Sequence, residues 1–287
     1  MPLPSVTVIV PTYQEGELLR GCLDALQAQS YPHDLLEIIV VNNCPAKSIE
    51  FVDEYPAIVF IEEQKPGSYA ARNAALAIAK GDIVAFTDAD CSPKNDWLTE
   101  AVTALQSGIE IVAGHVELSF ESNNLSVAEC YEKAFAFRQD INAQQGKSVT
   151  ANLITYKHSF ERIGLFDDSI MSGGDVKWSK QASEQGLKLA YVPSAIIGHP
   201  ARATMADLYQ KNRRVLGGVI QYGNGSSLDV LTPWLIMWIP PVSLWQLIWQ
   251  SASLTSIEKL KAGCAAWLLK LHYGKTKSAL LAGRGII

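Results

Sequence analysis

Apolar residues in the first half of the chain follow two patterns, which alternate along the sequence. Largely apolar runs rich in β-branched residues predict buried strands, at 6–10, 37–41, 58–61 and 83–87. Apolar residues at helical spacing separate these runs, at 18–26, 69–79 and 95–105. The alternation predicts an α/β fold with a mostly parallel sheet flanked by helices, in which ligands bind beyond the carboxyl ends of the strands.

Two local details of this pattern can be compared directly with a structure. We expect Pro11 to end the first strand, because a proline cannot donate to the sheet ladder. The first helix is expected to bury one apolar face, formed by Leu18, Leu19, Cys22, Leu23 and Leu26. The second half is less regular and predicts extended segments at 110–118 and 188–193 and helices at 127–145 and 204–220.

The segment from 230 to 257 contains no charged residue and is rich in tryptophan: Trp234, Trp238, Trp245 and Trp249. Pro240 and Pro241 interrupt it, so each half is shorter than the ~20 apolar residues of a membrane-spanning helix. Two interpretations remain open, a re-entrant or interfacial hairpin at a membrane and a tryptophan-rich pair of core helices. We expect residues 226–287 to form a C-terminal apolar helical hairpin that associates with a membrane surface.

The charge distribution limits the classes of partner. A net charge of −5 argues against non-specific binding of nucleic acid. After Ser256 the chain has six basic residues and one acid, so this tail carries +5 and suits an anionic surface. The five cysteines include no C-x-x-C pair, which argues against a zinc site or a disulfide framework and fits a reducing cytosol. The short apolar run at 6–10 is not typical of a signal peptide.

Two carboxylates, Asp88 and Asp90, directly follow the fourth predicted strand. At a strand end they can converge on one hard cation, which prefers oxygen ligands. Such a cation can neutralise a diphosphate as it departs. The alternative is a turn with two solvated acids.

Six motifs in a fixed order resemble the inverting glycosyltransferase family two, which has a GT-A fold. They read VIVPTYQE at 8–15, EIIVVNN at 37–43, PGSYAARN at 66–73, FTDAD at 86–90, SGGD at 172–175, and YVP followed by GHP within 191–200. The third matches the family's P-G-x-x-x-A-R-N segment. The resemblance extends from residue 6 to about residue 223 and implies transfer of a sugar from a nucleotide-sugar donor to an acceptor hydroxyl.

The resemblance implies a set of donor-binding residues: Pro11, Thr12, Tyr13, Glu15, Asn42, Lys65, Gly67, Arg72, Asn73, Asp88, Ala89, Arg213 and Arg214. The family usually has aspartate where this chain has Asn42, and an amide can still pair with a base edge because it both donates and accepts. Arg72 and Asn73 follow a glycine loop at a helix start, which favours phosphate or ribose oxygens. An ion pair with a surface acid is the alternative for Arg72. Arg214 replaces the tryptophan of the Q-x-x-R-W segment of processive relatives.

The resemblance also implies a catalytic base and a divalent metal, Mg²⁺ or Mn²⁺. Asp175 would take the proton of the acceptor hydroxyl, although Gly174 stands where relatives often have a second acid. The alternative is that Asp175 caps the following helix. Asp88, Asp90 and His199 would hold the metal, unless His199 has no ligand role.

These expectations together describe a GT-A-like domain at 1–225, with a donor half at about 1–118 and an acceptor half at 119–225. The expected partners are a UDP-sugar or other nucleotide sugar, a sugar or lipid-linked acceptor, and a membrane surface. We expect a cytoplasmic protein, peripheral or integral at the inner face of the cell membrane. Two alternatives are a sugar-phosphate nucleotidyltransferase, which needs a glycine-rich loop that 11–15 lacks, and a non-catalytic nucleotide-sugar-binding module.

Overall fold

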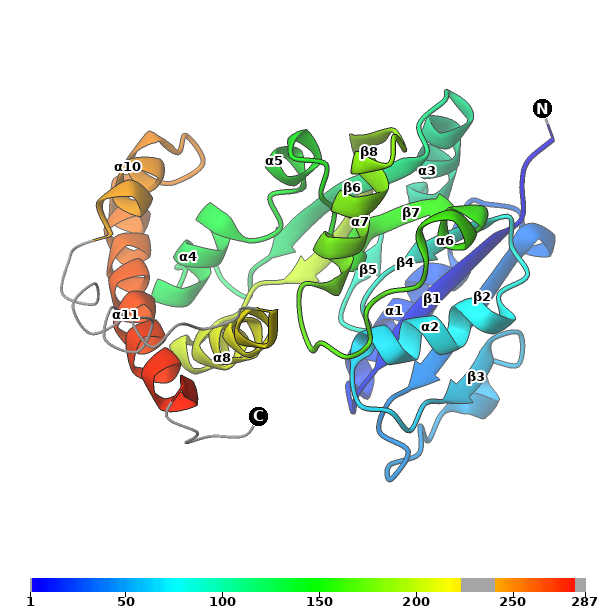
Figure 1. The fold of residues 1–287 in the computed structure, drawn as a ribbon, viewed down its shortest axis with the longest axis horizontal. Coiled ribbons are helices and arrows are strands. Elements are labelled where there is room, and N and C mark those ends of the chain that lie inside the picture. Colours follow the sequence, from blue (N-terminus) through cyan, green and yellow to red (C-terminus); the bar gives the residue numbers. More distant parts are fainter. Residues whose placement is uncertain (1, 223–240, 282–287) are drawn as a thin grey trace. The chain divides into compact units, whose positions relative to one another are not determined.

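The computed structural model describes residues 2–222 and 241–281, which form two compact units (Figure 1). The first unit comprises Met1–Glu117, Phe137–Ile170 and Gly174–His199. The second comprises Leu118–Ala136, Met171–Gly173 and Pro200–Ile287. The predicted membrane residues Trp234, Trp238 and Pro240 lie outside the described ranges. The expected division at residue 225 stays a prediction.

An eight-stranded sheet runs in the order β3-β2-β1-β4-β7-β6-β8-β5. Its strands are β1 (Val6–Thr12), β2 (Leu36–Asn42), β3 (Val59–Glu62), β4 (Ile83–Phe86), β5 (Ser92–Pro93), β6 (Ile111–Ser119), β7 (Leu153–Tyr156) and β8 (Leu189–Pro200). The four strands from β3 to β4 are parallel, whereas β7 pairs antiparallel with both β4 and β6, and β5 pairs antiparallel with β8. The parallel part therefore brings the carboxyl ends of β1, β2 and β4 to one edge.

The helices of the described ranges are α1 (Glu17–Gln27), α2 (Ser68–Ile78), α3 (Trp97–Gln106), α4 (Val127–Phe135), α5 (Gln139–Gln144), α6 (His158–Ile163), α7 (Gly174–Glu184), α8 (Met205–Tyr222), α10 (Val242–Gln250) and α11 (Ser256–Leu281). Short 3₁₀ turns occur at His33–Leu35, Val52–Glu54 and Thr150–Asn152. The predicted α/β fold is confirmed, and within the described ranges α8, α10 and α11 follow the last strand of the sheet.

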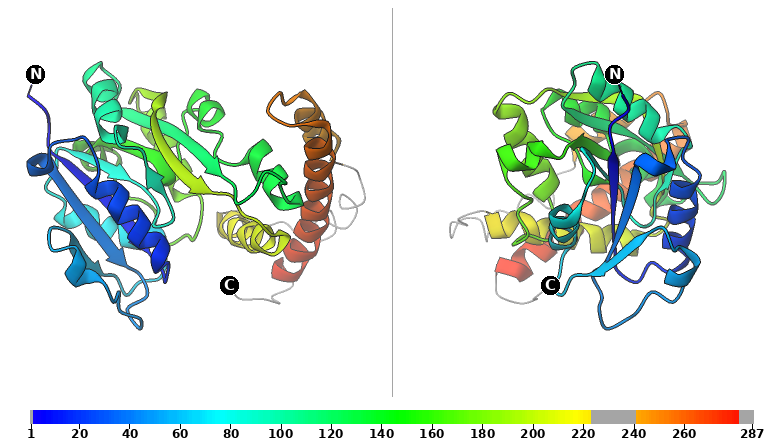
Figure 2. Two further views of the ribbon diagram at one scale, coloured as in Figure 1. Left: turned by 180° about the vertical axis from the view of Figure 1, so that it is seen from behind. Right: turned by 90° about the vertical axis from the view of Figure 1, so that its right-hand side faces the viewer.

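The first unit has three layers because strand side chains alternate between the two faces of the sheet. Val8 and Val10 of β1 join a core cluster with α1 and α3, whereas Ile9 joins a second cluster with α2, α6 and α7. Figures 1 and 2 show α1 and α2 on opposite faces of the sheet. Continuous apolar strands are required here because both faces are covered.

Apart from the unpredicted strand β5, the first half of the chain matches the predicted elements, with two local exceptions. β1 continues through Pro11, which is opposite Val41 of β2, so the prediction that Pro11 ends the strand is wrong. Pairing of β1 with β4 stops at Ile9, so no strand pairs with β1 on that side at Pro11, and a proline is tolerated there. Leu18 is also exposed, and the buried face of α1 consists of Leu19, Cys22, Leu23 and Leu26.

The second half departs further from its predicted elements. The single helix expected at 127–145 is two helices, because Phe137 between α4 and α5 has a positive φ of 49°. β8 is longer than the predicted segment at 188–193. The sequence pattern missed β7, a short central strand. In the first half it also missed β5, whose two residues are too few for a periodicity signal.

The second unit is helical and packs around α4 and α11. Cys130 of α4, Ile248 of α10, and Ala262 and Ala266 of α11 share one core cluster. A smaller cluster joins Leu208 of α8 to α4 and α11. Within residues 2–222 and 241–281, every helix is too short or too polar to cross a membrane.

Candidate active site

A cavity of about 410 Å³ lies at the carboxyl ends of β1 and β2. Its lining includes the strand-end residues Thr12 and Asn42, Glu15 from the loop after β1, and Lys47 and Phe51 from the segment after β2. Ligand pockets in proteins typically measure about 300 to 1,000 Å³. The cavity is therefore large enough for a nucleoside, and it contains three of the residues predicted to bind the donor.

The loop after β1 is held together by Glu15. Its carboxylate accepts a hydrogen bond of 2.6 Å from Thr12 Oγ1 and a further hydrogen bond from the Tyr13 backbone N–H. Thr12 and Pro11 are buried, whereas the ring of Tyr13 is exposed. Of the four residues predicted for this loop, Glu15 and Thr12 thus shape the turn and Tyr13 is presented to solvent.

Two asparagines organise the ends of the neighbouring loops. Asn42 donates to the Lys47 carbonyl (2.9 Å) and accepts from the Cys44 N–H (2.9 Å), so both ends of its amide already bind the backbone. Asn43, which the sequence analysis did not single out, donates to the carbonyl of Lys65 (2.8 Å) and accepts from the Gly67 N–H (2.7 Å). Gly67 needs its glycine because its φ is 120°. Asn43 therefore connects the end of β2 to the start of α2.

Arg72 binds Asp88, which is the first acid of the predicted metal motif. The guanidinium is 3% exposed, and Nη2 lies 2.5 Å from Asp88 Oδ1. Its Cζ also lies 5.7 Å from the ring centre of Tyr69, one turn earlier in α2. The predicted alternative of an ion pair is correct in kind, but Arg72 is buried and its partner belongs to the candidate site.

Tyr69 continues this series of contacts to the predicted base. Its hydroxyl donates to Asp175 Oδ1 at 2.9 Å. Burial raises the pKa of Tyr69, and the charge of Asp175 raises it further, so the phenol remains a proton donor. Asp88, Arg72, Tyr69 and Asp175 thus form one continuous series of side-chain contacts.

The carboxylate of Asp175 has four donors around it. Oδ1 accepts from the Tyr69 hydroxyl and the Val176 N–H, each at 2.9 Å. Oδ2 accepts from the Thr150 N–H at 2.9 Å and the Thr150 hydroxyl at 3.1 Å. An ionised carboxylate offers about four lone-pair sites, so all of them are used. Asp175 lies inside α7, which begins at Gly174, and not at the N-cap position.

Gly174 explains why this chain lacks a second acid before Asp175. A Cβ at Gly174 would lie 2.9 Å from Cε2 of Tyr69, closer than real Cβ atoms approach. The Tyr69 ring is itself packed against Phe166, with ring centres 5.8 Å apart, and has little room to move. The glycine and the tyrosine therefore fit one another, and the tyrosine ring leaves no space for a larger side chain at position 174.

The second acid of the metal motif meets the predicted histidine. Asp90 Oδ2 lies 3.4 Å from His199 Nε2, and one ligand atom from each of Asp90, Cys91 and His199 lies within 4.8 Å of the other two. A carboxylate and an imidazole at this separation fit shared coordination of Mn²⁺ or Mg²⁺. Burial, followed by the charges of Asp88 and Asp90, raises the pKa of the Cys91 thiol, which is therefore a poor ligand for a hard cation.

Asp88 is not part of this metal-ligand group, because Arg72 holds its carboxylate. The sequence predicted three ligands, and the structure brings together two of them. Asp88 remains partly exposed, so the ion pair with Arg72 does not seal its side chain.

Other predicted donor-binding residues have structural partners. Both ends of the Asn73 amide bind the backbone of Phe166, at 2.9 and 3.1 Å. Lys65 forms a 2.8 Å ion pair with Asp168, and the Ala89 side chain is buried in the core. Arg213 and Arg214 are exposed on α8, in the second unit. Their roles in donor binding stay predictions.

Two residues that contact Asp175 had no predicted role, namely Tyr69 and Thr150. Tyr69 lies three residues before Arg72, and this helical spacing was a usable signal, since residues three apart share a helix face. Thr150 lies in a 3₁₀ turn just before β7, an element that the sequence pattern did not predict. No periodicity could have indicated its place beside the predicted base.

Comparison with known proteins identifies related sequences. Residues 7–165 match the model of a family described as glycosyl transferase family 2. The chain is 36% identical over 227 residues to the glycosyltransferase AglE of Haloferax volcanii. The aligned segment covers 76% of this chain and 74% of the relative. It is 29% identical to the pre-mycofactocin glycosyltransferase of Mycobacterium tuberculosis, across 70% of this chain and 44% of that protein.

Solved structures share the fold at lower sequence identity. The mannosyltransferase PcManGT from Pyrobaculum calidifontis, solved with GDP-Man and Mn²⁺, superposes with a TM-score of 0.60 at 21% identity and covers 98% of this chain and 87% of its own. S. aureus TarS 1–349, solved with UDP-GlcNAc, gives a TM-score of 0.55 at 16% identity, across 99% of this chain and 93% of its own.

Proposed function

Since the chain belongs to glycosyl transferase family 2 and is a glycosyltransferase, we propose that it transfers a hexosyl group from a nucleotide sugar. The acceptor is a hydroxyl group, and the transfer inverts the anomeric configuration. The family match favours this reaction over the two alternatives considered from the sequence, nucleotidyl transfer and non-catalytic binding.

The strand-end cavity supports the assignment of the donor. Its size suits a nucleoside, and its lining contains Thr12, Glu15 and Asn42. Two structures with the same fold, PcManGT and TarS, were solved with GDP-Man and UDP-GlcNAc. We therefore propose a nucleoside diphosphate sugar as the donor, with its nucleotide base in this cavity and its diphosphate towards Asp88 and Asp90.

The observation that carries the proposal is the contact series from Asp88 through Arg72 and Tyr69 to Asp175. It connects the acid next to the proposed diphosphate with the residue proposed as the base. Arg72 is buried and keeps one nitrogen, Nε, without a hydrogen-bond partner. A buried guanidinium nitrogen of this kind is costly unless it is paired, so a phosphate oxygen is a suitable partner for it.

Asp175 is the proposed general base. The acceptor oxygen attacks the anomeric carbon while the bond from that carbon to the diphosphate oxygen breaks, and the diphosphate keeps the electron pair. The hydroxyl proton passes to Asp175. Because all four acceptor sites of Asp175 are used, one donor must give way. The hydroxyl groups of Tyr69 and Thr150 can rotate, whereas the two backbone N–H groups cannot.

Asp90 and His199 are the proposed metal ligands, and Asp88 lies two positions before Asp90 in the sequence. Their carboxylate and imidazole donors suit Mn²⁺ or Mg²⁺. When bound, the metal supplies positive charge to the leaving diphosphate.

The proposed acceptor is a sugar or a lipid-linked sugar near a membrane surface, and the proposed location is the cytoplasmic side of that membrane. The basic tail after Ser256 supports this placement. The donor and acceptor halves at 1–118 and 119–225 remain part of the proposal.

A panel of nucleotide sugars tests the proposed function. The true donor stabilises the native state and raises the apparent melting temperature, more strongly with Mn²⁺ than with EDTA. Release of the nucleoside diphosphate should depend on the same cation, and NMR of the product should show an inverted anomeric centre. Retention of configuration, or full activity in EDTA, would contradict the mechanism.

A further inference from the structure

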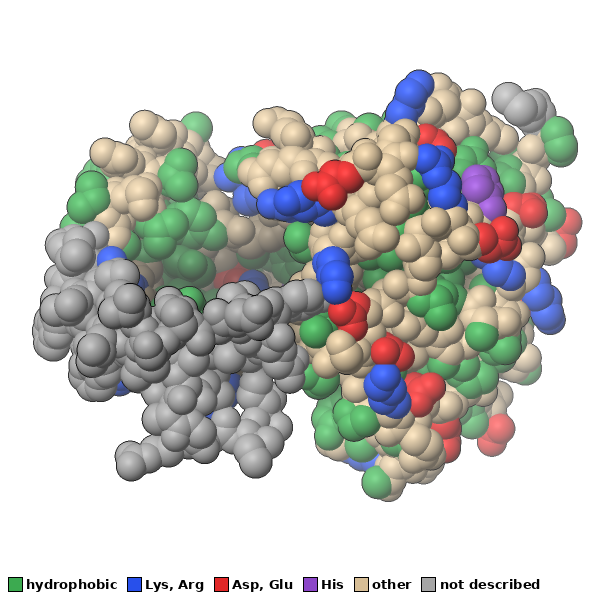
Figure 3. Space-filling model, in the orientation of Figure 1, with side chains coloured by type: hydrophobic (Ala, Val, Ile, Leu, Met, Phe, Trp, Pro, Cys, Tyr) green, Lys and Arg blue, Asp and Glu red, His purple; other side chains and the backbone are tan. Residues whose placement is uncertain are grey.

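Large apolar side chains are exposed where α10 and α11 join. Leu247 and Trp249 in the last turn of α10 are each 56% exposed, and Ile257 and Leu260 at the start of α11 are 68% and 64% exposed. We call these four residues the α10–α11 corner. Figure 3 shows hydrophobic side chains on the surface over these two helices. Concentrated apolar exposure is uncommon on soluble monomers and marks interaction surfaces.

The two parts of the corner belong to one surface. Lys259 of α11 donates to the Trp249 carbonyl at 2.9 Å, so the first turn of α11 lies against the last turn of α10. Trp245 of α10 also donates to the Gly263 carbonyl at 3.2 Å. Trp249 therefore lies next to the start of α11, the segment that carries Ile257 and Leu260.

α11 has apolar residues on two opposite faces. Ala262, Ala266 and Leu269 are buried on the face that packs within the second unit. Ile257, Leu260 and Cys264, spaced three and four residues apart, lie on the other side and are exposed. A helix that packs on one side needs apolar residues on that side only. The second apolar face thus indicates a second apolar partner.

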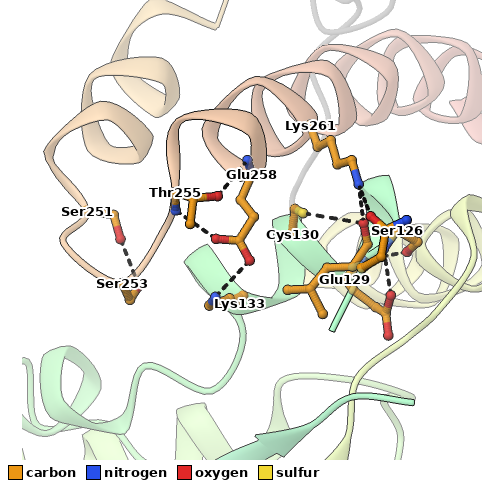
Figure 4. A network of polar contacts seen from close by, with 11 residues as sticks. Ser126, Glu129, Cys130, Lys133, Ser251, Ser253, Thr255, Glu258 and Lys261 are labelled. Atoms are coloured by element: carbon orange, nitrogen blue, oxygen red, sulfur yellow. Dashed lines mark hydrogen bonds and ion pairs between the residues drawn. The ribbon is translucent and has the colours of Figure 1, made fainter. Parts of the chain in front are cut away.

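Polar contacts fix the corner in place, so its exposure is not the result of a frayed end (Figure 4). Thr255 and Glu258 cap the start of α11 reciprocally, at 2.7 and 3.3 Å. Glu258 also binds Lys133 of α4 at 2.9 Å. Lys261 donates to the Leu125 carbonyl at 2.6 Å. These contacts hold the first two turns of α11 against the rest of the second unit.

The charge of the tail identifies the partner. The six basic residues and one acid after Ser256 favour an anionic surface, which attracts lysines close to it. Tryptophan prefers the headgroup level of a bilayer, and exposed Leu and Ile side chains prefer its acyl boundary. A second copy of the chain would instead bring two tails of +5 together.

We propose that the α10–α11 corner docks on an anionic lipid bilayer, with Leu247, Trp249, Ile257 and Leu260 inserted at the interface. The proposal rests on the proposed function, because it names the surface from which a membrane-bound acceptor is taken.

Vesicle co-sedimentation of the full chain tests this docking. The probes are vesicles of phosphatidylcholine alone and of phosphatidylcholine and phosphatidylglycerol in equal parts. The full chain should bind the anionic vesicles more tightly, and added salt should weaken the binding. The double variant Ile257→Ser/Leu260→Ser should lower the partition coefficient about tenfold or more, since two large apolar side chains are lost. Leu165→Ser is the matched control, because Leu165 is 58% exposed in the first unit.

Three results would overturn the proposal. Full-length protein that stays in the supernatant, or a double variant that binds as tightly as the unmodified chain, contradicts docking through the corner. A dimer in ultracentrifugation that the double variant dissociates without lipid identifies a second copy as the partner. Trp249→Ser repeats the test if the double variant does not fold. Release of nucleoside diphosphate in detergent should be unchanged in folded variants. This assay does not depend on vesicle binding, so it distinguishes failure of docking from failure of the proposed function.

Discussion

Replacing Asp175 with asparagine is the most informative change to the candidate site. The two side chains have almost the same shape, but one carboxylate oxygen becomes an NH₂ group that cannot accept. If this group takes the place of Oδ2, it faces the Thr150 N–H, and if it takes the place of Oδ1, it faces the Val176 N–H. Either way one buried backbone N–H loses its acceptor, whereas the Thr150 and Tyr69 hydroxyls can rotate.

The cost of this change follows from the four hydrogen bonds. An unsatisfied buried donor costs about 1–3 kcal/mol, and bonds to a charged group are stronger than bonds to a neutral one by about 1 kcal/mol. Asp175 is 8% exposed, so water replaces little of the loss. We expect Asp175→Asn to lower the free energy of unfolding by about 3–5 kcal/mol. Loss of the base should separately lower kcat by about 10²–10⁴-fold.

Urea unfolding and steady-state kinetics separate the two effects. Kinetics should be measured at low temperature, where the variant remains folded, with KM for the donor as a check on the nucleotide cavity. Tyr69→Phe is the matched control: it removes one of the four donors, keeps the carboxylate, and should cost only about 1 kcal/mol with a modest change in kcat. Folded Asp175→Asn protein with kcat within a few-fold of the unmodified enzyme would refute the assignment of the base.

Three further predictions concern other parts of the chain. Asp90→Asn should raise the Mn²⁺ concentration needed for half-maximal activity at least tenfold, measured by metal titration. If the variant needs no more Mn²⁺ than the unmodified chain, Asp90 is not a ligand. Gly174→Ala should displace the Tyr69 ring and cost about 1–3 kcal/mol in urea unfolding, because the added Cβ lies 2.9 Å from that ring; unchanged stability would show that the ring can move. Burial opposes ionisation of Glu132, yet Lys211 and Arg202 hold its pKa below 4.5 in the folded protein. The ionised carboxylate therefore stabilises the fold above pH 4.5. This contribution is lost as the pH falls through the lowered pKa of the folded state. Glu132→Gln should lower the free energy of unfolding by about 2–4 kcal/mol at neutral pH and weaken its dependence on pH in acid. A variant whose stability falls with pH as steeply as that of the unmodified chain would contradict this.

Elements of the first half were predictable because their signals are local. Short β-branched apolar runs such as 38–41 favour buried strands, and Asp88 and Asp90 follow such a run directly. The sequence order of these strands also indicated the edge at which the candidate site lies. β7 was not predictable, because a short strand inserted antiparallel beside β4 has no characteristic pattern and depends on the strands already in place.

The site was only partly predictable, because its contacts join distant residues. Tyr69 and Asp175 are 106 positions apart, and no spacing rule connects them. The motif placed Arg72 near the diphosphate, but its ion pair with Asp88 depends on how α2 packs on the sheet. Asn73 lies in the same motif, and the structure uses it to hold Phe166. A motif can therefore identify the segment of a site without identifying the role of each side chain.

A crystal structure of the full chain with a nucleoside diphosphate and Mn²⁺ tests the central claim most directly. We expect the nucleotide base in the cavity at the ends of β1 and β2, the cation on Asp90 and His199, and a diphosphate oxygen within hydrogen-bond distance of Arg72. A nucleotide bound elsewhere, or a cation that contacts neither Asp90 nor His199, would contradict it.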